Sequence, residues 1–199
     1  MSEKFIGKKL VIASNNPGKA KEIWILLKPY DIEVISVADL NIEEPYESGA
    51  TFVENSRLKA EYYGKLLNLP ALADDSGICI DALGGFPGIY SARVAGPNKD
   101  YNQAFKDIET KLHEKKLVSS AAHFICSLTL WQPDCAMQDF EGRIDGVISF
   151  PAKGDKGFGF DPLFTPNGYS HSFAEINPEI KNKISHRSIA FKKFVETCF

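Results

Sequence analysis

Short apolar runs alternate with amphipathic segments along most of the chain. Residues 9–13 and 33–37 predict two buried strands. Between them, four apolar side chains recur with helical spacing, and Asn16 followed by Pro17 is typical of a helix start. These four are Ala20, Ile23, Trp24 and Leu27. A strand, a polar turn and a helix start therefore meet near residue 16.

Later segments show further patterns typical of a helix and of strands. An apolar stripe with helical spacing predicts a helix after residue 100. Alternation predicts a strand over 122–130, which pairs with another over 140–148. The stripe consists of Tyr101, Ala104, Phe105, Ile108 and Leu112. We expect it to be core, and we expect His123 to pack in the core or at a sheet edge rather than to bind a ligand.

The chain is organised around residues 70–96. A short strand over 71–73 is predicted to end at Asp74 and Asp75, before a Ser-Gly turn. Because open α/β sheets bind ligands at the carboxyl ends of their strands, the pair indicates a metal-binding or proton-accepting carboxylate. The alternative is a turn in which the carboxylates bond their own backbone amides. Three glycines and a proline at 84–88 predict a tight turn or a close approach to a ligand.

The polar turn at 14–19 is a candidate phosphate site. Free amides at a helix N-terminus, with Lys19 in its first turn, favour phosphate oxygens. The turn is neither a Walker A loop nor a dinucleotide fingerprint, so a capped turn with a solvated lysine is the alternative.

A second helix is predicted after the acidic loop at 43–49. Thr51 and Glu54 form a capping box at its start. Asn55 and Lys59 are four residues apart and share a helix face, so both could point toward one ligand. A solvated surface pair is the alternative.

Glycines alternate with aromatic residues at 157–160. Flat rings beside open backbone groups suit the stacking and edge recognition of a base, and Asp161 follows as a possible acceptor. A bulge or an edge strand is the alternative. Lys181 and the pair His186-Arg187 come next, the pair at the start of a helix, and the planar guanidinium of arginine suits phosphate or a carbonyl edge.

Composition narrows the classes of function. With 199 residues, 44% hydrophobic and 25% charged, we expect one globular domain over 1–199. A formal net charge of -3 argues against broad binding to nucleic acid but allows a basic pocket for a phosphorylated metabolite. No apolar run approaches the roughly 18 residues that cross a bilayer, so we expect no membrane partner and a cytoplasmic protein. The four cysteines lack metal-ligand spacing and are expected to be reduced.

Six motifs follow one another along the chain. They are Ser14-Asn15-Asn16 with Lys19, Thr51-Phe52 with Glu54-Asn55 and Lys59, Ala73-Asp74-Asp75-Ser76-Gly77, Leu83-Gly84-Gly85 with Pro87-Gly88, Phe158-Gly159-Phe160-Asp161-Pro162, and Ser185-His186-Arg187. Each is weak alone. In this order and spacing, over nearly the whole chain, they resemble the inosine triphosphate pyrophosphatase family, or non-canonical purine nucleoside triphosphate pyrophosphatases, in its bacterial XTP/dITP diphosphatase branch.

The resemblance implies an α/β fold with an elongated, mixed, twisted sheet flanked by helices and two lobes with an active-site cleft between them. It implies a homodimer that needs Mg²⁺ and hydrolyses ITP, dITP and XTP to the monophosphate and pyrophosphate, keeping deaminated purines out of DNA and RNA. By matching position, it implies phosphate contacts at Ser14, Asn15, Asn16, Pro17, Gly18, Lys19 and Lys59. Asp75 would hold the metal and act as general base, with Ser76 on the substrate. Phe158, Gly159, Phe160, Asp161, Lys181, His186 and Arg187 would hold the base.

One position departs from the family pattern. Tyr46 stands where the resemblance implies a glutamate ligand, with Glu44 and Glu47 on either side. We take Glu47 as the second metal ligand beside Asp75. The alternative is that Tyr46 fills that position and the ion depends on Asp75, Asp74, water and the triphosphate, because Mg²⁺ commonly binds one or two carboxylates and keeps waters. Two other classes stay open: a different α/β phosphohydrolase, such as a Maf-like enzyme or one acting on modified pyrimidines, and a nucleotide-binding module without catalysis.

Overall fold

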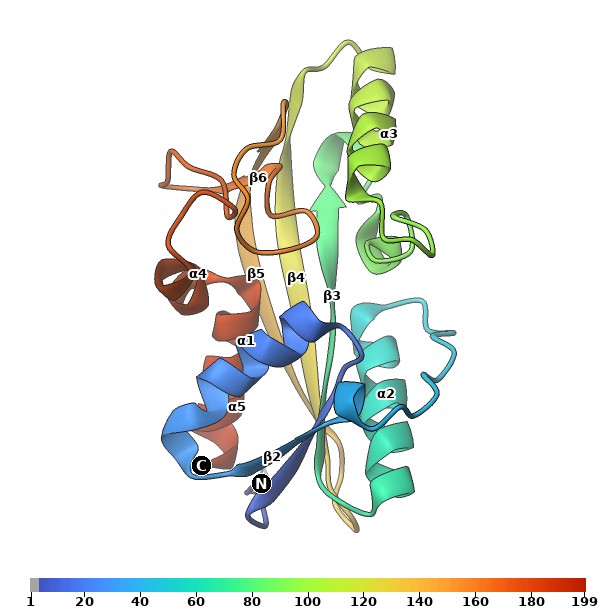
Figure 1. Cartoon of the computed structure of the whole chain (residues 1–199), viewed down its shortest axis with the longest axis vertical. Coiled ribbons are helices and arrows are strands. Elements are labelled where there is room, and N and C mark those ends of the chain that lie inside the picture. The colour runs from blue at the N-terminus through green and yellow to red at the C-terminus, as the bar shows by residue number, and fades with distance from the viewer. Residues whose placement is uncertain (1–3) are drawn as a thin grey trace. The chain divides into compact units, whose positions relative to one another are not determined.

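The computed structural model describes residues 4–199 as an α/β protein with a six-stranded sheet in the order β2-β1-β3-β4-β5-β6 (Figure 1). The strands are β1 Lys9–Ala13, β2 Glu33–Ser36, β3 Ala71–Ile80, β4 Ser119–Trp131, β5 Gln138–Ser149 and β6 Phe164–Pro166. The helices are α1 Pro17–Leu27, α2 Phe52–Leu67, α3 Tyr101–Glu114, α4 Pro178–Ile184 and α5 His186–Cys198. β1 runs parallel to β2 and β3, whereas β5 and β6 are antiparallel. The predicted α/β class with a mixed sheet is confirmed.

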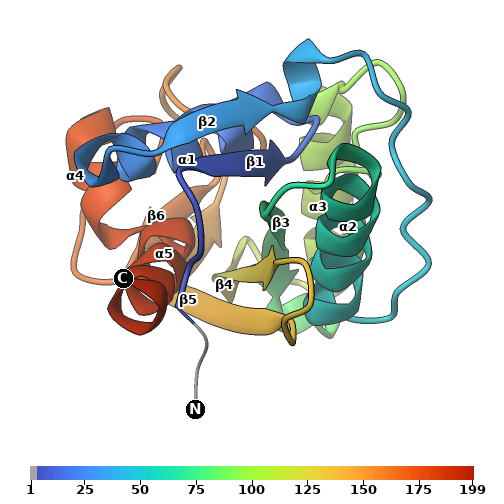
Figure 2. The same ribbon diagram turned by 90° about the horizontal axis from the view of Figure 1, so that it is seen from below.

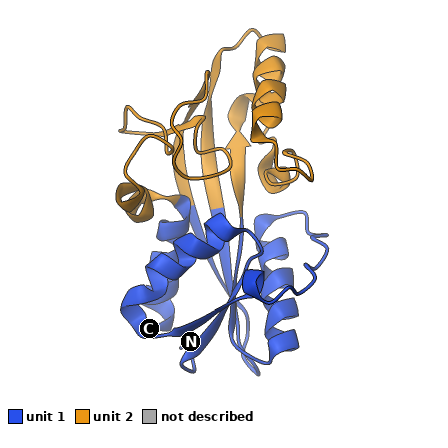
Figure 3. Cartoon of the chain, in the orientation of Figure 1, with its two compact units in different colours: residues 1–75, 126–142, 186–199 blue, residues 76–125, 143–185 orange. Residues whose placement is uncertain are grey.

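The chain divides into two compact units (Figure 3). Unit 1 comprises the described residues up to Asp75, together with Cys126–Gly142 and His186–Phe199. Unit 2 comprises Ser76–Ile125 and Arg143–Ser185. Strands β3, β4 and β5 contribute residues to both. The single domain expected from the length stays a prediction.

Helices cover both faces of the strands in unit 1. Leu10 and Ile12 of β1 pack in a cluster with α1 and α5, whereas Val11 and Ala13 pack with residues of α2. Figure 2 shows α2 and α5 on opposite sides of β3 and β4. Because side chains alternate along a strand, consecutive residues of a central strand reach different helices.

The predicted helix starts are confirmed. The Asn16 side chain caps α1 and Pro17 takes its first position. At α2, Thr51 and Glu54 form the predicted capping box. In the apolar stripe of α1, Trp24 is 46% exposed, whereas Ala20, Ile23 and Leu27 are buried.

The predicted end of β3 is wrong. The strand does not stop at Asp74 for a turn but continues to Ile80. Charged side chains disfavour a central strand, yet both aspartates have cationic partners within 3.0 Å. Gly77 belongs to the strand and not to a turn, and a Cβ there would lie 2.4 Å from Gly88 O and Ser91 Oγ.

Unit 2 has its own core. Ile78 and Ile80 of β3 pack with the apolar face of α3 and with Phe124, Phe164 and Phe173. Four of the five stripe residues of α3 are buried, which confirms that helix as core. The His123 side chain is 14% exposed, as expected for a packed or edge histidine. The four cysteines are free thiols.

Among residues 4–199, none of the helices combines the length and the apolar character that crossing a bilayer requires.

A glycine in α2 provides a test of how tightly this helix packs. A Cβ at Gly64 would lie 2.1 Å from Trp131 Cε3 of β4. Gly64→Ala would ordinarily stabilise a helix by about 1 kcal/mol. Here we expect overpacking to lower the free energy of unfolding by about 1–3 kcal/mol, measured by urea denaturation. Lys65→Ala, at the neighbouring exposed position, should change it by less than about 0.5 kcal/mol. A stabilised Gly64→Ala would contradict the packing.

Candidate functional site

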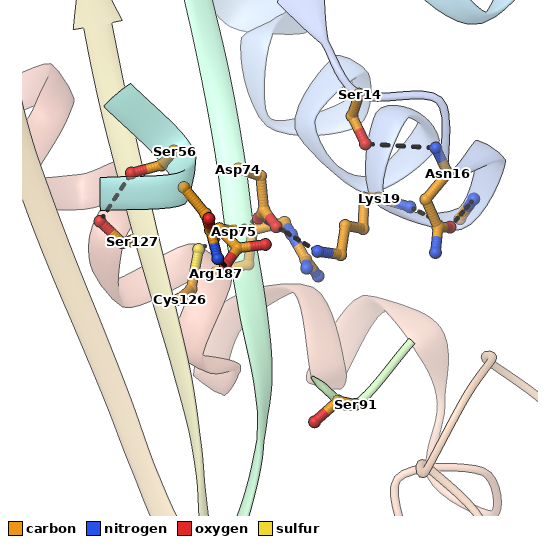
Figure 4. A network of polar contacts seen from close by, with 12 residues as sticks. Ser14, Asn16, Lys19, Ser56, Asp74, Asp75, Ser91, Cys126, Ser127 and Arg187 are labelled. Carbon is orange, nitrogen blue, oxygen red and sulfur yellow. Dashed lines mark hydrogen bonds and ion pairs between the residues drawn. The ribbon is translucent and has the colours of Figure 1, made fainter. Parts of the chain in front are cut away.

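The two aspartates of β3 serve different faces of unit 1. They are neighbours in an extended strand, so their side chains point in opposite directions. Asp74 contacts Lys19 of α1 and Arg187 of α5 (Figure 4), whereas Asp75 contacts Lys59 of α2. The sequence Asp-Asp therefore supplies two separate clusters.

Asp74 is fully buried and lies at the centre of an ion cluster. Its Oδ1 lies 2.9 Å from Lys19 Nζ, and its Oδ2 lies 2.8 Å from Arg187 Nε. The Cys126 thiol also donates to Oδ2, at 3.1 Å, and Arg187 forms a second ion pair with Glu22. Burial disfavours the carboxylate, but the charges of Arg187 and Lys19 outweigh it and hold the pKa of Asp74 well below its usual range. Asp74 thus stays ionised and fixes both cations.

Asp75 belongs to a second cluster, in which one lysine serves two carboxylates. Lys59 Nζ lies 3.0 Å from Asp75 Oδ1 and 2.7 Å from Glu47 Oε1. Asn55 Nδ2 donates to Asp75 Oδ2 at 3.4 Å. Burial raises the pKa of Asp75, although the charges of Lys59 and Lys19 oppose the rise. Burial disfavours the charge of Lys59, but Asp75 and Glu47 outweigh it and raise the pKa of Lys59. Among the groups that pair directly, two carboxylates share one ammonium, which leaves an excess of negative charge.

This donor set suits a hard divalent cation. Within residues 4–199, no group of three or more histidine, cysteine or acidic side chains is arranged to hold a metal. A pair of carboxylates is nonetheless enough for Mg²⁺, which takes its other ligands from water and substrate phosphates. Glu47 shares Lys59 with Asp75, whereas the Tyr46 side chain is 83% exposed. Glu47 and Asp75 therefore fit the ion better than Tyr46 does.

Asn16 occupies the helix amides that we expected to be free. Its Oδ1 accepts from Gly18 N at 2.9 Å and from Lys19 N at 3.3 Å. Pro17 has no N–H, and the Ser14 hydroxyl accepts from Asn16 N at 3.3 Å (Figure 4). The expectation of open amides is wrong because the cap uses them. Side chains, above all Lys19, are left to contact a phosphate.

The aromatic motif lies in unit 2. Asp161 accepts from Phe158 N at 2.8 Å and forms an ion pair with Lys181, whose Nζ lies 4.8 Å from the centre of the Phe158 ring. Phe160 is 3% exposed and packs in the core of unit 2, so its ring is unsuited to stacking on a base. Phe158 is partly exposed, and Gly159 adopts a φ of +62°.

The predicted base-binding residues belong to different units. His186 and Arg187 begin α5 in unit 1 and are 4% and 1% exposed. The other five, at 158–161 and 181, lie in unit 2, as does the partly exposed Ser76. The role of each in binding a nucleotide stays a prediction.

Three residues of unit 1 that contact the predicted site residues were not predicted from the sequence. Glu22, which pairs with Arg187, lies one helical turn after Lys19. Tyr63 lies one turn after Lys59, and its hydroxyl accepts from Asn15 Nδ2 at 3.1 Å. Helical spacing could have indicated both. Cys126 had no such signal, because it meets Asp74 across neighbouring strands.

Asp74→Asn tests the buried ion cluster. Removing one partner of a buried pair costs about 3–5 kcal/mol, and we expect a loss of that size in the free energy of unfolding at pH 7. Asp145→Asn, which removes the exposed partner of Arg143, should cost less than about 1 kcal/mol.

The same variant gives a pH test in metal-free protein. The pKa of Asp74 in the folded protein is held below its unfolded value of about 3.9. Its contribution to the free energy of unfolding is therefore complete above about pH 3.9 and is lost as the pH falls through the folded pKa. The difference in the free energy of unfolding between wild type and Asp74→Asn should therefore shrink below about pH 4. A difference that is independent of pH would contradict the ion cluster.

Comparisons with known proteins agree with this fold. The sequence profile of the Ham1 family matches residues 10–197. A dITP/XTP pyrophosphatase of Zymomonas mobilis is 45% identical over 191 residues, covering 96% of this chain and 91% of that protein. One of Rhodospirillum centenum is 45% identical over 197 residues, covering 98% and 97%.

Solved structures lead to the same family. The HAM1 protein of Coxiella burnetii matches with a TM-score of 0.86 and 34% identity, covering 96% of this chain and 98% of that one. The Ham1 protein of Staphylococcus aureus matches with a TM-score of 0.82 and 37% identity, covering 95% and 98%. The resemblance inferred from the motifs is thereby confirmed, and the chain belongs to the Ham1 family.

Proposed function

We propose that this chain hydrolyses dITP, XTP and ITP to the nucleoside monophosphate and pyrophosphate, and so removes deaminated purine nucleotides from the pool. Two relatives that are 45% identical over nearly its full length are named dITP/XTP pyrophosphatases. The observation that carries the proposal is the cluster in which Lys59 bridges Glu47 and Asp75. A buried lysine between two carboxylates has the charges that a metal-bound triphosphate requires.

Side chains of unit 1 would bind the triphosphate. Lys59 and Lys19 are both largely buried, so little water screens the attraction between their ammonium groups and phosphate oxygens. Ser14 to Gly18 complete this side of the site. In this role the lysines offset the charge that develops on departing pyrophosphate. Because the two ammonium groups are already fixed, they need little reorganisation during the reaction.

Asp75 would take the proton of the attacking water. Burial raises the pKa of this carboxyl, so its carboxylate is more basic than that of an exposed aspartate. Lys59 and Asn55 donate to its two oxygens and thereby fix its orientation. Proton transfer to a positioned base typically contributes 10² to 10⁴ in rate, at the order-of-magnitude level.

Asp75 and Glu47 would hold Mg²⁺. A bound divalent cation neutralises phosphate charge and supports attack on phosphorus. The excess negative charge of the two carboxylates over Lys59 supports this assignment. The homodimer implied by the family resemblance and the cytoplasmic location expected from the sequence stay part of the proposal.

Recognition of the base would fall to donors that match a 6-oxo group. Hypoxanthine and xanthine carry an acceptor where adenine carries an amino donor, so adenine would leave such donors unpaired, at a cost of about 1–3 kcal/mol per group. The donors proposed for the 6-oxo group are His186 and Arg187 of unit 1. The other residues that the resemblance implies for holding the base are Phe158, Gly159, Phe160, Asp161 and Lys181 of unit 2. Because the Phe160 ring is core, we assign stacking to Phe158.

Neighbouring variants test the second metal ligand. Glu47→Gln keeps the shape of the side chain but removes its charge, so the concentration of Mg²⁺ needed for half-maximal pyrophosphate release should rise by roughly tenfold or more, a loss of about 1.4 kcal/mol. Tyr46→Phe removes only an exposed hydroxyl and should leave the metal dependence unchanged. If Tyr46→Phe has the larger effect, Glu47 is not the ligand.

Pyrophosphate release across a nucleotide panel tests the function as a whole. With Mg²⁺ we expect release from dITP, XTP and ITP, and roughly tenfold or more slower release from ATP. Asp75→Asn should lose about 10²-fold or more in kcat while nucleotide binding largely persists. Asp107→Asn, on the exposed side of α3, is the control. Preference for modified pyrimidines, binding without release, or near-normal turnover by Asp75→Asn would each contradict the proposal.

A further inference from the structure

Helix α2 presents three polar groups along one face. Asn55, Lys59 and Tyr63 are spaced by four residues, so they follow one another along the helix. The first two donate to Asp75. The third reaches a different segment, because its hydroxyl accepts from Asn15 in the turn between β1 and α1. One helix face thus contacts both the carboxylate and the candidate phosphate turn.

The Tyr63 hydroxyl is the third polar group of this stripe. Its residue is fully buried, and its oxygen lies 3.1 Å from Asn15 Nδ2. Burial, and next the charge of Glu44, raises the pKa of Tyr63 to about 12. The hydroxyl therefore stays protonated at any ordinary assay pH, and its contact with the Asn15 amide does not depend on ionisation.

Contacts between the N-terminal half of α2 and the sheet keep this hydroxyl in place. The Ser56 hydroxyl lies 2.7 Å from Thr129 Oγ1, and Thr129 in turn donates to Asp139 at 2.8 Å. Arg57 pairs with the same carboxylate through two of its nitrogens. These contacts attach the N-terminal half of the helix to β4 and β5, so Tyr63 is carried by a fixed element and not by a loop.

We propose that Tyr63 is a positioning residue for nucleotide binding, whose hydroxyl orients the Asn15 side chain toward the phosphates. This inference rests on the proposed function, because Asn15 matters only if the turn at 14–19 contacts the substrate. Without the hydroxyl, the Asn15 amide has lost the acceptor that fixes its rotamer, and some of its orientational freedom must be lost when substrate binds.

Tyr63→Phe tests this directly, because it removes one oxygen and retains the buried ring. The contact is the same in the ground state and in the transition state, so KM for dITP should rise while kcat stays within about twofold. For one neutral hydrogen bond we expect a rise of roughly 2- to 10-fold. Tyr62→Phe, whose ring packs edge-on against Tyr63 and is 38% exposed, is the matched control and should leave both constants unchanged.

A double-mutant cycle separates positioning from packing. If Tyr63 acts through Asn15, adding Tyr63→Phe to Asn15→Ala should change KM no further. Effects that multiply in the double variant, or a KM for Tyr63→Phe equal to that of wild type, would overturn the proposal.

A readout without turnover keeps this test independent of the proposed function. The side-chain amide resonances of Asn15 should shift in Tyr63→Phe and stay in place in Tyr62→Phe. Should the wild type release no pyrophosphate from dITP, the proposed function fails while a shifted Asn15 resonance still supports the positioning contact. An Asn15 resonance that does not move in Tyr63→Phe overturns the inference whatever the activity.

Discussion

The arrangement of unit 1 depends on one buried carboxylate. Asp74 lies in a central strand with no exposure, and taking an isolated charge to such a place costs several kcal/mol. Lys19 and Arg187 compensate it directly, and each comes from a different helix. Burial of these three charged groups is therefore favourable only when all three are present. That requirement joins β3, α1 and α5, and it fixes Lys19 in the first turn of α1 (Figure 4).

The residue next to it faces the other side of the strand and has the opposite character. The pKa of Asp74 is held down by two cations, whereas burial raises the pKa of Asp75, which shares its lysine with Glu47. A carboxylate saturated by cations suits a structural role. One that is more basic and close to excess negative charge suits metal binding and proton transfer. Two adjacent aspartates can thus have different roles, because consecutive side chains of a strand point to opposite faces.

Local signals in the sequence predicted those elements whose causes are local. The cap at Asn16 and the capping box of α2 were both recognisable within four residues. The full length of β3 was not, because an Asp-Asp-Ser-Gly run favours a turn by itself. Its strand conformation depends on Lys19 and Arg187, which are distant in sequence and carry no periodic signal.

The site itself was predictable in part. Asn55 and Lys59 could be placed on one helix face by spacing alone, and both do meet Asp75. Spacing could not decide between Tyr46 and Glu47, because the loop that carries them has no regular structure. The expectation of open helix amides was also wrong, since whether a cap side chain occupies the amides of the next residues depends on its rotamer.

A crystal structure with Mg²⁺ and a non-hydrolysable dITP analogue tests this account most directly. We predict triphosphate oxygens within hydrogen-bonding distance of the ammonium groups of Lys19 and Lys59, and a cation bound by Asp75 and Glu47. Phosphates bound away from these lysines, or a cation held without Asp75, would contradict it.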